Sequence, residues 1–244
     1  LYDGLEKMDT SAAVTRDQAA QMVWNAMQAY EVEYKDGVLQ DKVVGTTNDK
    51  VTLLYDRYDA WVSVGTLTKV DSTDLSITMS AADKVASDYS ENDSVVDFTK
   101  LNQDYSALLG QKVKVLFTAK NLDDVIGVFA TKNNTVVTAY QNALDVENAK
   151  IKLDDTLYTL ESAGVTVIVD GATAAENWHA VDFKDTNSPA VITLIDNDNN
   201  GKIDTAVVKT VEVAKVTFVS GTQIIAGGKT YKTADENIAE GLAK

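Results

Sequence analysis

Residues 196–204 read Asp-Asn-Asp-Asn-Asn-Gly-Lys-Ile-Asp, a run of oxygen-bearing side chains whose spacing suits a hard cation. The run matches the first nine positions of an EF-hand-type calcium loop, with glycine at the sixth position for the sharp turn. The candidate ligands are Asp196, Asp198, Asn200, Lys202 and Asp204. Position twelve is Val207 where such a loop carries a bidentate glutamate, and the flanking residues favour strands over helices. Two interpretations stay open: a weak Ca²⁺ site, or an Asx-rich turn between strands that holds no ion.

Groups that perform catalysis are scarce in this chain. Cysteine is absent, which excludes disulfides, thiolate metal sites and cysteine nucleophiles. The single histidine, His179, follows Trp178 in a segment expected to form a short helix, and no Gly-x-Ser-x-Gly motif accompanies it. The pairs Asp123-Asp124 and Asp154-Asp155 are expected in turns, where aspartate is favoured for its local hydrogen bonds. The sequence therefore predicts a protein that is not an enzyme.

Aromatic side chains offer a second kind of chemistry, because their flat apolar faces can stack on sugar rings. The best cluster for such stacking is Tyr55, Tyr58 and Trp61. The alternative is that these residues belong to the core or to a sheet edge. Glycan binding at this cluster is thus a hypothesis that stands beside a purely structural role.

The charge balance restricts the partners of the chain. It has 22 basic and 37 acidic residues and a net charge of −15, which disfavours nucleic acid and anionic membrane surfaces. The longest apolar runs, such as Val165–Val169, are far shorter than the roughly 20 residues that span a bilayer. The chain begins at Leu1 with neither an initiator methionine nor a signal peptide, so we expect a fragment of a longer exported protein.

The elements that must position these groups follow two sequence patterns, one helical and one typical of strands. From Ala19 to Tyr30, apolar residues recur at helical spacing, and Thr15 with Gln18 forms a capping-box pattern, which predicts a helix over 15–30. We expect its apolar stripe to pack against another element, because a single helix of this length is marginal in water.

The remainder is predicted to be mainly β, in sandwich- or barrel-like modules. Alternation in 112–117 predicts a half-buried strand. Tight turns predict hairpins at Asn133-Asn134, Asp154-Asp155 and Gly227-Gly228. Short helices are expected at 104–109, 173–178 and 235–242.

A weak internal repeat suggests how the chain is divided. Residues 115–125 align without gaps on 193–203, and Ile151 with Leu157-Tyr158 echoes Ile224 with Thr230-Tyr231. We therefore expect a helical remnant over 1–30, a first β module over 31–131 and a second over 132–208. Residues 209–244 would begin a further module or supply completing strands.

The first 30 residues resemble the C-terminal half of an S-layer homology (SLH) repeat. Gly4-Leu5 is followed by Val14-Thr15-Arg16-Asp17-Gln18-Ala19 and an apolar helix, as in that family. Gln18 departs from the usual glutamate, and the first helix of the repeat would lie upstream. The β modules are similar in residue pattern to those that follow SLH repeats in bacterial surface proteins.

The resemblance implies a cell-wall location and a wall polymer as partner. Complete SLH repeats bind an anionic secondary cell-wall polymer, a role that would fall here to Thr15 and Arg16. The expected function is that of a non-catalytic S-layer-like structural or assembly protein, extracellular and self-associating. The alternative is an accessory, glycan-binding or adhesive region of a secreted enzyme anchored by SLH repeats.

Overall fold

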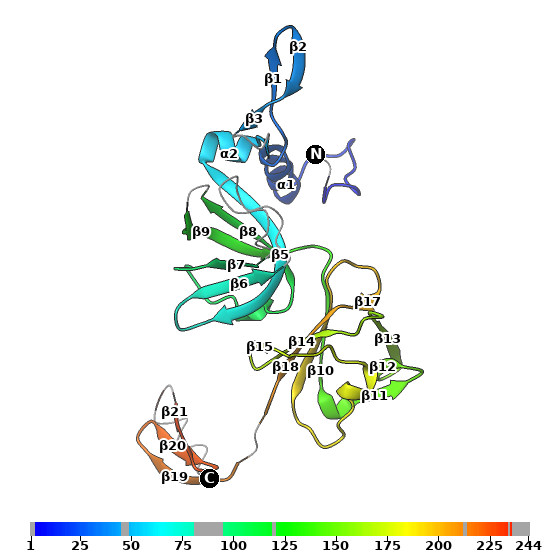
Figure 1. Ribbon diagram of the computed structural model, residues 1–244, viewed down its shortest axis with the longest axis vertical. Helices are drawn as coiled ribbons and strands as arrows, with labels where there is room; N and C mark the ends of the chain where they lie inside the picture. Colours follow the sequence, from blue (N-terminus) through cyan, green and yellow to red (C-terminus); the bar gives the residue numbers. More distant parts are fainter. Residues whose placement is uncertain are drawn as a thin grey trace.

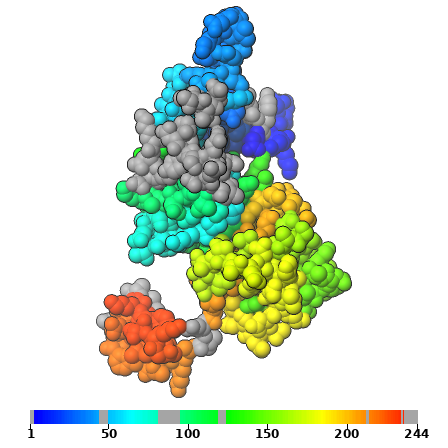
Figure 2. Space-filling model, viewed as in Figure 1, coloured from blue at the N-terminus to red at the C-terminus, as the bar shows by residue number. Residues whose placement is uncertain are grey.

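A computed structural model describes residues 3–44, 49–80, 95–118, 121–211, 214–233 and 235. The fold is mainly β with few helices, as predicted from the sequence. Two β modules and a small C-terminal three-stranded sheet follow one another along the chain (Figures 1 and 2). In the part of the chain that is described, no helix has the length and apolar character needed to cross a membrane.

The N-terminal region combines two helices with two small hairpins. Hairpin β1–β2 turns at Asp36-Gly37, where both residues have positive φ, and it projects at one end of the molecule (Figure 1). Helix α2 was not predicted from the sequence. The elements of this region are α1 (Arg16–Met27), β1 (Val32–Lys35), β2 (Val38–Asp41), β3 (Val43–Val44), β4 (Asp49–Lys50) and α2 (Leu53–Tyr58).

Helix α1 confirms the predicted capping box. The Thr15 hydroxyl accepts from the Gln18 amide, and the Gln18 side chain accepts from the Thr15 amide at 2.9 Å. The expected packing of the apolar stripe is wrong, because Met22 and Val23 are exposed. The helix instead turns Trp24 and Asn25 inward, and Asn25 is 8% exposed.

The first module is one five-stranded antiparallel sheet with strand order β7-β6-β5-β8-β9. Strand β8 alternates as predicted, with Val113, Val115 and Phe117 fully buried. Phe117 packs edge-on against Phe98 at a centroid distance of 5.3 Å and anchors the core. The strands are β5 (Ala60–Asp71), β6 (Ser76–Ser80), β7 (Val95–Phe98), β8 (Lys112–Thr118) and β9 (Asn121–Ala130).

The second module encloses its core between a five-stranded sheet, β10-β16-β18-β14-β15, and a four-stranded one, β11-β12-β13-β17. Two of its strand pairs, β13–β17 and β14–β18, are parallel. The strands are β10 (Thr135–Tyr140), β11 (Leu144–Glu147), β12 (Lys150–Leu153), β13 (Thr156–Leu160), β14 (Thr166–Val169), β15 (Ala172–Thr173), β16 (Val191–Asp196), β17 (Lys202–Ile203) and β18 (Thr205–Lys209).

A small C-terminal sheet, β19-β20-β21, is a meander of β19 (Val216–Ser220), β20 (Gln223–Ala226) and β21 (Lys229–Lys232). Its last turn, Gly227-Gly228, has positive φ at both glycines and confirms that predicted hairpin. The hairpin at Asp154-Asp155 is also confirmed, between β12 and β13.

One cross-strand row recurs in three of the described sheets. In each meander a valine faces an isoleucine, which faces an aromatic residue on the next strand. The rows are Val70–Ile77–Phe98, Val146–Ile151–Tyr158 and Val219–Ile224–Tyr231. Because a one-residue slip would move every side chain to the other face, the same valine–isoleucine–aromatic pattern in three meanders indicates one repeated unit.

The longer sequence repeat, which aligns 115–125 with 193–203, also has a structural counterpart. Strand β8 pairs with β5 and β9, and β16 pairs with β10 and β18, in both cases antiparallel. Val62 faces Leu116 in the first module, and Val137 faces Leu194 in the second. The aligned segments 115–125 and 193–203 thus begin in the central strand of a corresponding three-stranded unit.

Several local predictions are wrong. Asn133-Asn134 does not close a hairpin, because β9 pairs with β8 while β10 pairs with β16, and residues 131–134 link the two modules. Residues 173–178 are not helical, since Trp178 bridges Val165 in an extended arrangement. A 3₁₀ helix forms later, at Ala180–Phe183, with His179 as its N-cap. Asp123-Asp124 lies in β9 and not in a turn.

The short helix predicted at 104–109 is present as a 3₁₀ helix over Ser106–Leu108. It is followed by Gly110, whose φ of +81° reverses the chain before β8. The helix predicted at 235–242 falls outside the described residues, except for residue 235.

Candidate functional site

The acidic loop connects β16 to β18 in the second module. Asp196 ends β16 and is 4% exposed, and Asp204 immediately precedes β18. One carboxylate oxygen from each of Asp196, Asp198 and Asp204 lies within 4.8 Å of the others. The structure therefore brings together three of the five candidate ligands.

Hydrogen bonds within the loop hold the first aspartate. The Asp196 carboxylate accepts the backbone amides of Asn199 at 2.7 Å and Gly201 at 2.8 Å. Gly201 has a φ of +82°, so the glycine allows the turn that aims its amide at this carboxylate. These contacts fit an Asx-type turn, and they would also hold Asp196 as the first ligand of a cation loop.

Asn200 and Lys202 lie differently from the three aspartates. The Asn200 Oδ1 accepts the Lys202 amide at 2.8 Å, and its Nδ2 donates to Glu161 at 3.0 Å. Lys202 Nζ lies 3.5 Å from a Glu161 carboxylate oxygen, so this lysine partly neutralises the negative charge of Glu161 beside the loop. Val207 belongs to β18, where it pairs with Ile168, and supplies no twelfth-position ligand.

Electrostatics inside the loop favour a positive partner. Burial raises the pKa of Asp204 above its ordinary value of 3.8, and the nearby charges of Asp198, Asp196 and Glu161 raise it further. The hydrogen bond from the Asn197 amide opposes this rise. The hydrogen bond from Asn200 lowers the pKa of Glu161, so that carboxylate stays charged beside the cluster. Three carboxylates and a nearby fourth form an oxygen-only donor set that suits Ca²⁺.

The second residue of the loop, Asn197, joins the two modules. Its side-chain Oδ1 accepts the backbone amide of Lys112 at 2.7 Å, and its Nδ2 donates to the Gly110 carbonyl at 3.1 Å. The same Nδ2 donates to the Thr205 hydroxyl at 3.2 Å. Asn197 is 7% exposed, so these bonds across 85 and more residues of sequence are shielded from water. Asn197 is not among the candidate ligands of the calcium-loop pattern, and no local signal in the sequence reveals a partner so distant.

Gly110 makes the same joint tight. A side-chain carbon at this position would lie 2.7 Å from Val207 Cγ2 and 2.8 Å from Ile195 Cδ1. Asn134, in the link between modules, accepts from the Lys112 amide at 3.2 Å and donates to the Lys112 carbonyl at 2.8 Å. The first module is therefore fixed to the second by both backbone packing and buried hydrogen bonds.

The residues singled out for the wall polymer lie on α1. Thr15 is the N-cap and Arg16 the first helical residue, and both are exposed. No ion pair of Arg16 is found among the described residues, so its guanidinium faces solvent.

The aromatic cluster is brought together only in part. Tyr55 and Trp61 lie 4.7 Å apart between ring centroids, tilted by 49°. Trp61 packs against the first module's core, while Tyr58 is 64% exposed. None of these three residues lines the cavity described next.

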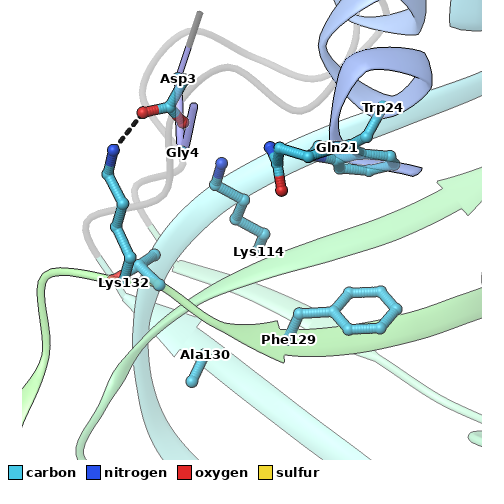
Figure 3. A pocket seen from close by; sticks show the side chains of 9 residues that line it. Asp3, Gly4, Gln21, Trp24, Lys114, Phe129, Ala130 and Lys132 are labelled. Carbon is cyan, nitrogen blue, oxygen red and sulfur yellow. Dashed lines mark hydrogen bonds and ion pairs between the residues drawn. The ribbon is translucent and has the colours of Figure 1, made fainter. Parts of the chain in front are cut away.

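Sequence reasoning missed a cavity between α1 and the outer face of the first module (Figure 3). It has a volume of about 380 Å³ and includes Trp24 and Gln21 from α1, Lys114 from β8 and Phe129 from β9. Lys132 closes one side through ion pairs with Asp3 and with Glu6, the latter at 3.3 Å. An outward-facing Phe and Lys in separate strands give no sequence signal of a shared site.

Comparisons of the chain with protein-family models, with curated proteins and with solved structures found no match.

Proposed function

We propose that this chain is a structural part of a bacterial cell-surface protein, built from tandem β modules and without catalytic activity of its own. The observation that carries the proposal is the valine–isoleucine–aromatic row that recurs in register in three meanders along the chain. Repetition of one unit along a chain is typical of proteins that act through length and spacing.

The joint between the modules favours a rigid connection over a hinge. Asn197 and Gly110 bind the modules through buried contacts, whereas domains that move relative to one another usually meet through exposed and polar linkers. A net charge of −15 keeps such an exposed assembly soluble. In this proposal the exposed α1 belongs to an SLH-like anchoring repeat, with Thr15 and Arg16 toward the wall polymer.

Calcium is part of the same proposal as a stabilising ion. A cation held by Asp196, Asp198 and Asp204 would relieve the repulsion among these carboxylates. Because Asp204 also accepts the Asn197 amide at 2.6 Å, an ion there would stiffen the joint itself. The ion is structural in this account and takes part in no reaction.

Protease shaving of intact cells of the source organism tests the location. Peptides from the β modules should be released under conditions that leave a cytosolic marker protein intact. Release of these peptides only after lysis would overturn the proposal of a surface protein.

A second candidate function is an accessory or glycan-binding region of a secreted enzyme anchored by SLH repeats. The cavity that contains Trp24 and Phe129 favours it, since aromatic and charged groups meet there. Loss of a surface glycosidase activity on deletion of 60–209 from the parent protein, with unchanged surface structure, would favour this candidate.

A further inference from the structure

The hairpin β1–β2 is amphipathic, and its apolar face is open to solvent. Tyr34 faces Leu39 across the two strands, and Val32 lies on the same face. These three side chains are 58% to 75% exposed. The opposite face carries Glu33 and Lys35. Because a two-stranded hairpin alone is marginally stable in water, this one would be stabilised by a surface that covers its apolar face.

The C-terminal sheet has an open strand edge. Its order is β19-β20-β21, so in the described part of the chain β19 has a neighbouring strand on one side only. In the first module, the strand that begins the same meander is β5, and β8 pairs with it on its other side. Strand β8 in turn pairs with β9. An open edge with unpaired backbone groups is a template for a further strand.

The sequence supports the correspondence of β19 with β5. Superposing the row valines Val70 and Val219 places residues 209–220 on the twelve residues of β5. Thr217 then falls on Thr68. The C-terminal sheet therefore matches the β5-β6-β7 part of the first module, without a counterpart of the β8–β9 pair among the described residues.

The aromatic residue of the C-terminal row shows the effect of this difference. In the first module, Phe98 is fully buried, because Phe117 of β8 packs edge-on against it at a centroid distance of 5.3 Å. Its counterpart Tyr231 is 42% exposed. A groove of about 760 Å³ lies beside this tyrosine, lined in part by Ile224 and Ala226. The groove and the β19 edge together have the form of an acceptor for a pair of strands.

Charge selects the hairpin β1–β2 as the pair that fits. Residues 215–232 contain three lysines and no acidic residue, in a chain whose net charge is −15. Residues 32–41 contain three acidic residues and one lysine. Opposite charges of this kind steer encounter and favour the correct partner. The hairpin and the C-terminal sheet lie at opposite ends of the molecule, so they meet between two copies and not within one (Figure 1).

We propose that the β1–β2 hairpin of one copy adds to the β19 edge of a second copy, in the position that β8–β9 has in the first module. Strand β1 pairs with β19, and the apolar face around Tyr34 covers the groove beside Tyr231. Main-chain hydrogen bonds give such strand addition its affinity, and alternate side chains give it specificity. The contact involves neither Thr15 nor Arg16, the residues that the SLH resemblance assigns to the wall polymer.

The two surfaces differ, so the contact is head-to-tail and can continue into a row of copies. In such a row, each copy donates its hairpin at one end and accepts a hairpin at the other. This inference deepens the proposed structural role, because it names the partner of the unit as a second copy of the same chain.

Sedimentation velocity of the purified 244-residue chain tests the contact. We expect the sedimentation coefficient to rise between about 10 µM and about 1 mM protein, with a Kd on the order of 100 µM, as for a small interface. Tyr34→Ala and Tyr231→Ala should each weaken association about tenfold or more, since central aromatic residues dominate the energy of interfaces.

Two matched controls remove an exposed apolar side chain from the opposite face of each element. Val38→Ala alters the other face of the hairpin, and Phe218→Ala alters the other face of the C-terminal sheet. Both controls should associate as the unmodified chain does. Amide spectra of Tyr231→Ala and Phe218→Ala report whether the sheet is retained, so loss of the contact is distinguished from loss of the fold.

A mixture of the two weakened variants distinguishes a head-to-tail contact from a symmetric one. Tyr34→Ala keeps an intact acceptor sheet, and Tyr231→Ala keeps an intact hairpin. Each pair of unlike chains can therefore form one intact contact. The mixture should give a dimer that does not grow further, whereas each variant alone should stay monomeric at the same concentration.

Three outcomes would overturn the proposal. They are an unmodified chain that is monomeric at about 1 mM, equal association in a variant and its matched control, and the absence of a dimer in the mixture. The location of the parent protein is tested separately by protease shaving. Failure of the contact would leave the surface proposal standing, and failure of the surface proposal would leave the contact standing.

Discussion

Replacing Asn197 with alanine should uncouple the two modules while leaving each of them folded. Asn197→Ala deprives the buried Gly110 carbonyl of the one hydrogen bond described for it. The Lys112 amide falls back on the longer 3.2 Å bond to Asn134. An unsatisfied buried carbonyl costs about 1–3 kcal/mol, and two weakened neutral bonds add about 0.5–1 kcal/mol each, for a total of roughly 2–5 kcal/mol.

Differential scanning calorimetry measures this coupling. The unmodified chain should unfold the two modules in one transition, because the joint makes them cooperative. Asn197→Ala should lower the midpoint and separate the transitions. The matched control is Asn200→Ala, in the same loop, which loses the bond to Glu161 but no contact with the first module. A single unshifted transition in Asn197→Ala, or equal effects of both variants, would refute the role given to Asn197.

Further predictions concern the loop, its charge and the repeat. Millimolar Ca²⁺ added after EDTA treatment should raise the melting temperature, because a free Ca²⁺ concentration of 100 times Kd adds about 2.7 kcal/mol of stability. Asp204→Asn should abolish this rise. An unchanged melting temperature in the unmodified chain would exclude the ion. In EDTA, the folded state holds the Asp204 proton above pH 3.8, so this group's contribution to stability falls as pH rises through its raised folded pKa; urea midpoints from pH 4 to 7 should show that slope and lose it in Asp204→Asn. Gly110→Ala should cost about 1–3 kcal/mol through overpacking and a strained φ, measured by urea unfolding, and a neutral variant would contradict the packed joint. Ile151→Ala should cost about 2–5 kcal/mol, and Ile77→Ala the same in the first module, since both isoleucines are buried at the centre of the repeated row.

Local chemistry made several elements predictable from the sequence. Thr15 and Gln18 satisfy each other's backbone amides within one turn, so the start of α1 needed no distant information. The turns at Asp154-Asp155 and Gly227-Gly228 close between strands that are adjacent in sequence. The alternation of 112–117 is likewise local, because one face of β8 meets the core.

Other features depend on contacts that sequence spacing does not reveal. Asn133-Asn134 has the composition of a turn, but composition does not specify which strands pair, and the chain leaves one sheet for another there. The segment before Trp178 has helical spacing, yet Trp178 packs edge-on against Phe183 at 5.2 Å and is held extended. The acidic loop was recognisable from its aspartates, whereas the joint at Asn197 and the cavity at Trp24 and Phe129 depend on elements far apart in sequence.

The central claim is that the β modules form a rigid, tandemly repeated structural unit. The natural absence of cysteine allows spin labels at two introduced cysteines, Thr73→Cys in the first module and Asp155→Cys in the second, both at exposed turn positions. Double electron–electron resonance should give a single narrow distance distribution that broadens in Asn197→Ala. A broad distribution in the otherwise unmodified chain would show freely moving modules and would contradict the account.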